Sequence, residues 1–145
     1  MSEELVKLVE KGYEAWNEGD RGWVLEHMDP DVRWITPPDD PDPGTYEGLA
    51  GVEQYWSQWR AAVGQLNFLI EEIIDAGQMI VVVARRQGRG EHSGLEVSDR
   101  VIQVFHFDEN QKCTEVHEYY DRDAALSTVR GERTAGAADA SCEPG

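Results

Sequence analysis

Hydrophobic side chains recur at helical spacing along the first part of the chain. An amphipathic helix is predicted over residues 3–18, with an apolar face made of Leu5, Leu8, Val9, Gly12, Tyr13 and Trp16. The stretch "NEGD" breaks it and precedes a short second helix, which "MDPD" is expected to end. A third helix follows a proline-rich acidic loop, and its aromatic stripe is Val52, Tyr55, Trp56, Trp59 and Val63. We expect the loop, "ITPPDDPDPGTYEG" (residues 35–48), to rim a pocket that the aromatic side chains help to wall.

Beta-branched and alternating segments dominate the rest of the chain. They predict strands over residues 32–36, 66–74, 79–86, 95–107 and 112–120, with one or two helical turns over 123–129. Residues 130–145 are small, polar and poor in apolar side chains, which is typical of a mobile tail. The prediction is one domain over residues 1–129 and a flexible tail over 130–145.

Helices first and strands afterwards indicate an α+β fold, in which three helices from the N-terminal half cover one face of a curved antiparallel or mixed sheet. Such a sheet closes into a cone-shaped barrel, and the wide end of a cone is not necessarily filled by side chains. A pocket is therefore expected between the helices and the sheet.

The charge balance narrows the range of partners. The chain has 13 basic and 29 acidic residues, a net charge of -16, whereas nucleic acids and anionic membranes require clustered Lys and Arg. There is no apolar run of about 20 residues to span a bilayer, and the cysteines and histidines lack zinc-site spacing. A cytoplasmic protein without a metal or organic cofactor is expected.

Four stretches, "YEAWNEGD", "DPDVRW", "TYEGLAGVEQYW" and "VFHFDENQKCTEVHEYYD", together with the order of elements, resemble the SnoaL-like branch of the nuclear-transport-factor-2-like superfamily. The resemblance covers about residues 5–129. It implies a conical fold with a deep pocket and a homodimer formed through the outer sheet face. The superfamily includes ketosteroid isomerases, polyketide cyclases, limonene-epoxide hydrolases and non-enzymatic binding or dimerisation modules, so fold alone does not select a chemistry.

Matched position by position, the chain departs from the steroid isomerases. Gln103 stands where those enzymes carry a protonated aspartic acid, and Tyr120 where an aromatic residue lines the pocket. Residues 34–37 carry no carboxylate at the position of the isomerases' general base, and Tyr13 is one residue out of register with their helix-1 tyrosine. Gln103 can donate a hydrogen bond but cannot release a proton, so isomerase chemistry by the familiar route is not expected.

Two carboxylates are candidates for other chemistry. Asp99 and Glu118 lie on adjacent predicted strands, as a water-holding base and an acid of an epoxide hydrolase would. Asp99 and Arg100 point to opposite faces, however, so the hydrolases' Asp/Arg constellation is not expected to be reproduced. A polyketide cyclase requires fewer catalytic groups: Asp99 would shuttle a proton and Gln103 would polarise a ketone. Ordinary alternatives stay open: a solvated Asp99, and a Glu118 held in a structural hydrogen bond.

The period of two assigns faces to the last two strands. With Gln103 inward, the inward-facing set is Asp99, Val101, Phe105, Thr114, Val116, Glu118 and Tyr120, and the outward-facing set is Arg100, Ile102, Val104, His106, His117 and Tyr119. Arg85 and Arg86 are expected to pair with nearby acids rather than with a substrate carboxylate.

The leading hypothesis is a protein that binds a hydrophobic or aromatic small molecule, with isomerase or cyclase-type acid–base catalysis as a further step. The candidate catalytic residues are Asp99, Gln103 and Glu118. The candidate pocket residues are Tyr13, Trp16, His27, Trp34, Tyr55, Trp59, Phe105 and Tyr120. The alternatives are a non-catalytic carrier or dimerisation module and a cofactor-free epoxide-type hydrolase.

Overall fold

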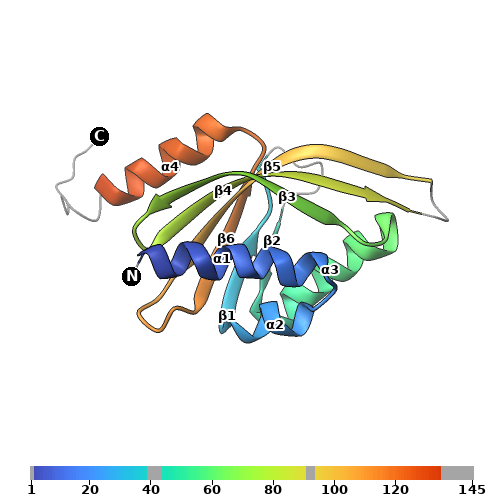
Figure 1. Cartoon of the computed structure of the whole chain (residues 1–145), viewed down its shortest axis with the longest axis horizontal. Coiled ribbons are helices and arrows are strands. Elements are labelled where there is room, and N and C mark those ends of the chain that lie inside the picture. The colour runs from blue at the N-terminus through green and yellow to red at the C-terminus, as the bar shows by residue number, and fades with distance from the viewer. Residues whose placement is uncertain (1, 39–43, 91–93, 135–145) are drawn as a thin grey trace.

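The computed structural model describes residues 2–38, 44–90 and 94–134. The chain folds into four helices and six strands in the order α1 (Ser2–Asn17), α2 (Arg21–Glu26), β1 (Met28–Ile35), β2 (Thr45–Glu47), α3 (Gly48–Val63), β3 (Asn67–Ala76), β4 (Met79–Arg89), β5 (Glu96–Phe107), β6 (Cys113–Tyr119) and α4 (Arg122–Thr134). The predicted α+β class is confirmed, and Figure 1 shows the helices arranged around one strongly curved sheet.

The sheet is open and mixed, with strand order β2-β1-β6-β5-β4-β3. All neighbouring strands are antiparallel except β1 and β6, which are parallel. The long hairpins β3–β4 and β4–β5 form one half of the sheet, and β1, β2 and β6 form the other. Because β1 crosses back beside the last strand, side chains from distant parts of the sequence meet on the concave face.

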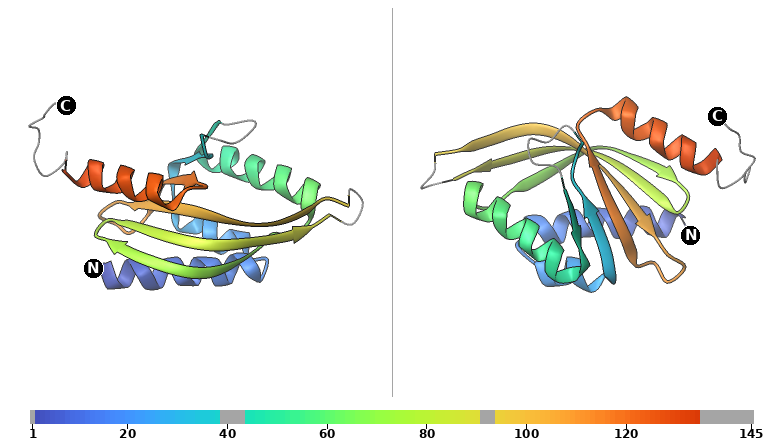
Figure 2. Two further views of the ribbon diagram at one scale, coloured as in Figure 1. Left: turned by 90° about the horizontal axis from the view of Figure 1, so that it is seen from above. Right: turned by 180° about the vertical axis from the view of Figure 1, so that it is seen from behind.

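Two apolar clusters lie on opposite faces of the sheet. The concave face packs against α1, α2 and α3 around a core that includes Val9, Trp56 and Val116. On the convex face, α4 places Ala125 and Val129 over side chains of β4, β5 and β6. Figure 2 shows α1 and α4 on opposite sides of β3–β5. The apolar part of the outer face is thus covered by the chain's own last helix.

Several boundaries differ from the predicted ones. "MDPD" was expected to end a helix, but β1 already begins at Met28 and pairs there with β6. The pairing shifts register between Met28 and Arg33, which accommodates Pro30, a residue without a backbone N–H for the ladder. The short strand β2 was not predicted. It lies in the proline-rich loop, of which residues 39–43 fall outside the described part.

The last helix is longer than predicted. Helix α4 continues through Thr134, so residues 130–134 are helical although the sequence placed the start of the tail at Arg130. The remainder of the expected tail, residues 135–145, lies outside the described residues. No helix in the described part of the chain is long and apolar enough to cross a membrane.

Candidate active site

A pocket opens between the concave sheet face and helices α1, α2 and α3. The space in it open to the centre of a water molecule is about 100 Å³, whereas a single water needs about 10–15 Å³ on that measure. Its wall is mainly apolar and includes all five tryptophans, Trp16, Trp23, Trp34, Trp56 and Trp59. The polar lining residues include Tyr13, Tyr55, Arg86, Gln103 and Glu118.

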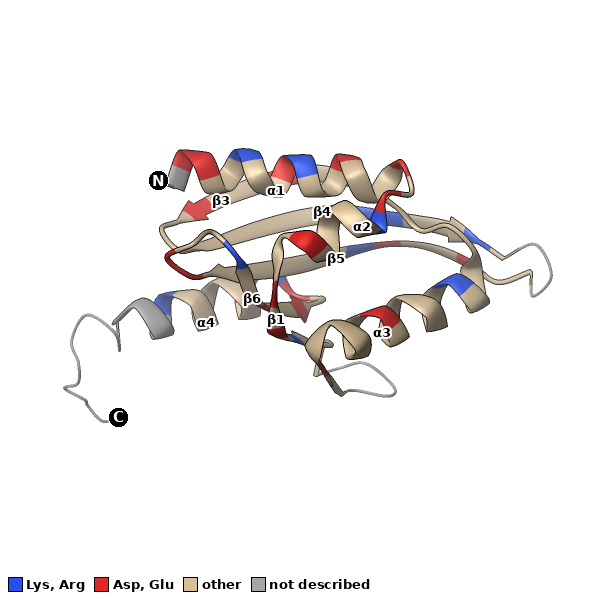
Figure 3. Cartoon of the chain, turned by 90° about the horizontal axis from the view of Figure 1, so that it is seen from below, with Lys and Arg blue, Asp and Glu red and all other residues tan. Residues whose placement is uncertain are grey.

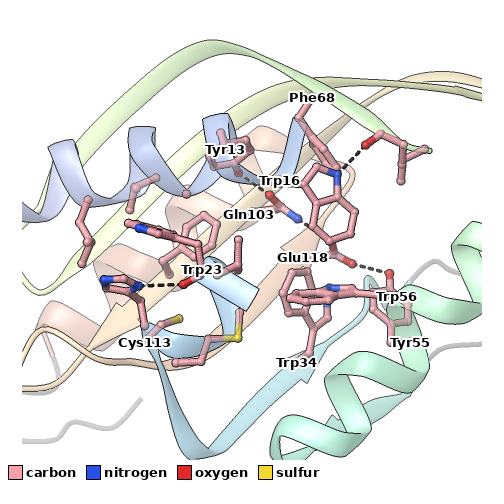
Figure 4. A pocket seen from close by; sticks show the side chains of 18 of the residues that line it. Tyr13, Trp16, Trp23, Trp34, Tyr55, Trp56, Phe68, Gln103, Cys113 and Glu118 are labelled. Atoms are coloured by element: carbon pink, nitrogen blue, oxygen red, sulfur yellow. Dashed lines mark hydrogen bonds between the residues drawn. The ribbon is translucent and has the colours of Figure 1, made fainter. Parts of the chain in front are cut away.

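A buried carboxylate lies at the centre of these polar groups. Glu118 is 2% exposed, and each of its two oxygens accepts a hydrogen bond. The Tyr55 hydroxyl donates to Oε1 over 2.8 Å, and the Gln103 amide nitrogen donates to Oε2 over 2.8 Å. The three residues come from α3, β5 and β6, and Figure 4 shows them converging in the pocket.

Tyr13 extends this network to the first helix. Its hydroxyl donates a hydrogen bond to Gln103 Oε1, and its ring packs edge-on against Phe68 and Phe105. The sequence had placed Tyr13 one residue out of register with the isomerases' helix-1 tyrosine, yet it contacts Gln103 directly. By occupying Gln103 Oε1, Tyr13 fixes the amide with its nitrogen directed at Glu118.

Burial sets the protonation of the network. Burial raises the pKa of Glu118. The charge of Arg86, the hydrogen bonds from Gln103 and Tyr55 and the nearby indole of Trp34 act in the opposite direction and lower it, but by less. The Trp34 N–H is itself buried without a hydrogen-bond partner among the described residues. Burial and the charge of Glu118 also raise the pKa values of Tyr13 and Tyr55, so both phenols remain hydrogen-bond donors. A carboxyl group with a raised pKa beside fixed donors is suited to acid–base chemistry.

Arg86 is the functional candidate that the sequence reasoning missed. It lines the pocket, is 2% exposed, and donates two hydrogen bonds of 3.0 and 2.9 Å to Asp99 on the adjacent strand. Burial disfavours the charge of Arg86, but the hydrogen bonds and charges of Asp99 and Glu118 outweigh burial and raise the pKa of the guanidinium. Asp99 and its neighbour Arg100 in β5 were not expected to form an Asp/Arg pair, but Asp99 forms such a pair with Arg86 of β4. The antiparallel register places Arg86 opposite Asp99.

Asp99 does not belong to the pocket wall. Its side chain is 42% exposed beside the buried guanidinium, and it is not among the lining residues. Tyr120 is also outside the lining; it is 36% exposed, with its ring 5.9 Å from the Arg86 guanidinium. Asp99 is hydrogen-bonded to Arg86, whereas Gln103 and Glu118 are hydrogen-bonded to each other, so the three candidate catalytic residues do not form one hydrogen-bonded group.

The other candidate pocket residues do line the cavity: Tyr13, Trp16, His27, Trp34, Tyr55, Trp59 and Phe105. His27 donates from Nδ1 to the carbonyl of Trp23 over 2.8 Å, and its ring stacks on the Trp23 ring at 3.9 Å. Helix α2 positions this pair because the Asp20 carboxylate caps its first turn through the Trp23 N–H.

Further lining residues were not singled out as pocket residues from the sequence, among them Trp23, Trp56, Phe68, Met28 and Cys113. Trp56 belongs to the predicted aromatic stripe and Phe68 to the predicted strand over residues 66–74, so both lie in segments that the sequence pattern identified. Within the described residues, no group of three or more His, Cys, Asp or Glu side chains lies close enough to hold a metal ion.

Comparison with known proteins agrees with this architecture. TerC, crystallised with polyporic acid, is 20% identical; the match covers 87% of this chain and 98% of TerC, with a TM-score of 0.69. A putative SnoaL-like polyketide cyclase from Jannaschia sp. CCS1 is 19% identical over 88% of this chain and 90% of its own, with a TM-score of 0.66. RV0760c from Mycobacterium tuberculosis, in complex with estradiol-17beta-hemisuccinate, is 17% identical over 81% and 94%, with a TM-score of 0.66.

These identities establish a shared fold. No curated protein matches the chain significantly. Residues 9–116, well over half of the chain, match the model of the SnoaL-like domain. The chain therefore belongs to the SnoaL-like domain family, with the nuclear-transport-factor-2-like fold of its structural neighbours.

Proposed function

We propose that the protein binds a hydrophobic or aromatic small molecule in the pocket and that Glu118 moves a proton on it. The observation that carries the proposal is a buried carboxylate with a raised pKa in a cavity walled by tryptophans. Flat indole faces suit a planar ligand. Structural neighbours crystallised with polyporic acid and with estradiol-17beta-hemisuccinate support a small-molecule ligand.

The proposed reaction is a proton transfer of the isomerase or cyclase type. As a carboxylate, Glu118 takes a proton from the carbon next to a ligand carbonyl, which leaves an enolate and a neutral Glu118. The enolate oxygen accepts a hydrogen bond from the second amide hydrogen of Gln103, whose first already binds Glu118. Glu118 then returns its proton to the ligand. Tyr13 holds the amide in the donating orientation.

A cofactor-free hydrolase is the second candidate, and Arg86 favours it. The guanidinium is hydrogen-bonded to Asp99 and is close enough to Glu118 for their charges to interact, which gives the acid–arginine–acid order expected of an epoxide-type hydrolase. In that reaction Glu118 would take a proton from a water that attacks an epoxide carbon, the carbon–oxygen bond would break, and Glu118 would return the proton to the released oxygen. Arg86 would favour the ionised form of Glu118.

A non-catalytic carrier is the remaining alternative. Every oxygen of Glu118 already accepts a donor, and Gln103 is engaged at both ends, so the network also satisfies itself without a ligand. A homodimer through the outer sheet face stays a proposal from the family resemblance. In this chain such an interface would include α4, because Ala125 and Val129 cover the apolar part of that face.

A thermal-shift screen of polycyclic ketones, phenols and epoxides tests the proposal. A ligand at 100 times its dissociation constant adds about 2.7 kcal/mol to the free energy of unfolding. The shift should disappear in Trp59→Ala, which opens the pocket wall, and persist in Tyr119→Leu, which perturbs the opposite sheet face. If no compound shifts the transition, or if both variants respond equally, ligand binding in this pocket is refuted.

Turnover separates the three alternatives once a ligand is known. For an acid–base enzyme, Glu118→Gln retains binding and loses turnover. For a carrier, the same substitution changes affinity alone, and no product forms with the unmodified protein. Conversion of an epoxide, abolished in both Glu118→Gln and Arg86→Met, would favour the hydrolase.

A further inference from the structure

Four described arginines lack an acidic partner in a strongly acidic chain. Five others form ion pairs with Asp or Glu: Arg33, Arg85, Arg86, Arg100 and Arg122. The four without a carboxylate partner among the described residues are Arg21, Arg60, Arg89 and Arg130. Arg130 belongs to α4, and Arg60 has a neutral partner, because it donates a hydrogen bond to Ser57 Oγ over 3.3 Å. Since the net charge is -16, unpaired cations close together are an unusual feature of this surface.

Arg21 of α2 and Arg60 of α3 lie near one another, and the backbone of Arg89 in β4 lies close to that of Arg60. The Arg21 guanidinium lies 5.5 Å from the ring centre of Trp16, and Trp16 packs at 4.9 Å against Trp56, one helical turn before Arg60 in α3. After burial, the charge of Arg60 also helps to lower the pKa of Arg21. Gly64 donates its N–H to the Arg60 carbonyl over 2.8 Å, and a Cβ at Gly64 would meet the Arg89 carbonyl at 3.5 Å. Figure 3 shows the blue segments of α2 and α3 toward the same end of the molecule.

This end of the molecule adjoins the pocket. The Arg21 guanidinium lies 5.5 Å from the ring centre of Trp16, which lines the cavity. Trp16 is in turn anchored by its indole N–H, which donates to the Leu66 carbonyl over 2.5 Å. An anion held by Arg21 would therefore lie against the aromatic wall.

Arg21 also carries an orphaned donor. Its Nε atom is buried and has no hydrogen-bond partner among the described residues. Buried donors in native proteins nearly always have an acceptor, and each exception calls for a missing partner. An oxyanion accepts from a guanidinium Nε and Nη in parallel, so it would satisfy this group and the unpaired charge together.

We propose that Arg21 and Arg60 bind an oxyanion, a carboxylate or sulfonate, attached to the ligand whose ring system occupies the pocket. The inference rests on the proposed function and adds the ligand's class and orientation. The anionic end faces the arginines at the rim, because the carboxylate of Glu118 in the interior repels a negative charge. The uncharged ring end then lies beside Glu118 and Gln103. Arg89 adds a positive field without a direct contact.

A matched pair of fluorescent probes tests this assignment. 1-Anilinonaphthalene-8-sulfonate and N-phenyl-1-naphthylamine share one aromatic framework and differ by the sulfonate. Both are titrated into the wild-type chain, into Arg21→Gln/Arg60→Gln, and into Arg33→Gln as a control. Arg33 is a half-exposed arginine of β1 that pairs with Glu115, and it has no part in the proposed site. Trp59→Ala serves as the pocket control.

The double variant should lose about tenfold in affinity for the sulfonate, as expected for two partly exposed charge pairs, and the loss should shrink at high salt. Its affinity for the neutral amine should be unchanged, and Arg33→Gln should bind both probes like the wild type. Equal losses for both probes, or an unchanged affinity for the sulfonate, would overturn the anion site while leaving the pocket intact. If neither probe binds the wild type, or Trp59→Ala does not weaken the amine, the proposed function fails as well.

Discussion

The hydrogen bond between Tyr55 and Glu118 provides the sharpest energetic prediction. Both side chains are buried, and the hydroxyl donates to Oε1 over 2.8 Å. Replacing Tyr55 with Phe removes one donor from a buried carboxylate and leaves the ring packing in place. Leaving a buried acceptor without its donor costs about 1–3 kcal/mol, so Tyr55→Phe should lower the free energy of unfolding by about that amount.

Urea unfolding followed by tryptophan fluorescence measures this loss. Tyr46→Phe is the matched control, because Tyr46 donates to Gln58 over 3.2 Å at the surface, and its loss should stay within about 0.5 kcal/mol. A double-mutant cycle with Glu118→Gln should give a coupling of about 1–2 kcal/mol, since the neutral amide accepts a weaker hydrogen bond. A Tyr55→Phe loss no larger than that of the control, or zero coupling, would refute a stabilising hydrogen bond from Tyr55 to Glu118.

Three further predictions concern Glu118, Arg86 and Cys113. Burial raises the pKa of Glu118 above 4.5, so the stability that Glu118 contributes is fully present below that pH and is lost as the pH rises through the native pKa. In urea unfolding at pH 4–8, the stability of Glu118→Gln relative to the wild type should therefore increase with pH. A constant difference would contradict the raised pKa. Arg86→Met removes the cation paired with Asp99 and should lower the free energy of unfolding by roughly 1–3 kcal/mol in the same assay. Arg33→Met, at an exposed pair of 3.8 Å, should lower it by less than about 0.5 kcal/mol. Equal losses would show that the Arg86 pair adds nothing to stability. Burial raises the pKa of the Cys113 thiol to about 12. In a Cys142→Ser background, a disulfide reagent at pH 8 should therefore modify the protein in urea but not in buffer. Rapid labelling of the native state would contradict the burial of Cys113.

The periodicity of the sequence predicted the faces of the central part of the last two strands correctly, but not the place of Asp99 and Tyr120, which were expected inward and lie outside the pocket wall. Gln103, Phe105 and Glu118 are on the concave side, while Ile102 and Tyr119 pack on the convex side. A strand's period of two depends only on local backbone geometry, and an inward Gln and Glu among apolar neighbours are conspicuous. The central carboxylate of the candidate site was therefore accessible from the sequence.

The partner of Asp99 was not accessible in the same way. Arg85 and Arg86 are consecutive, and which of them faces the pocket depends on the register between β4 and β5. That register is set by a connection whose length and turn type the sequence pattern does not specify. Strand β2 was not predicted for a different reason: its three residues are too few to show an alternating pattern.

Hydrogen–deuterium exchange measures proton transfer by Glu118 directly. A ketone that stabilises the protein in the thermal-shift screen is incubated with it in D2O, and the hydrogens next to its carbonyl are followed by NMR. The wild type should accelerate the exchange, Glu118→Gln should abolish this acceleration, and Tyr46→Phe should leave it unchanged. If the hydrogens of the bound ketone exchange no faster than in buffer, Glu118 does not transfer a proton, and the protein binds its ligand without acting on it.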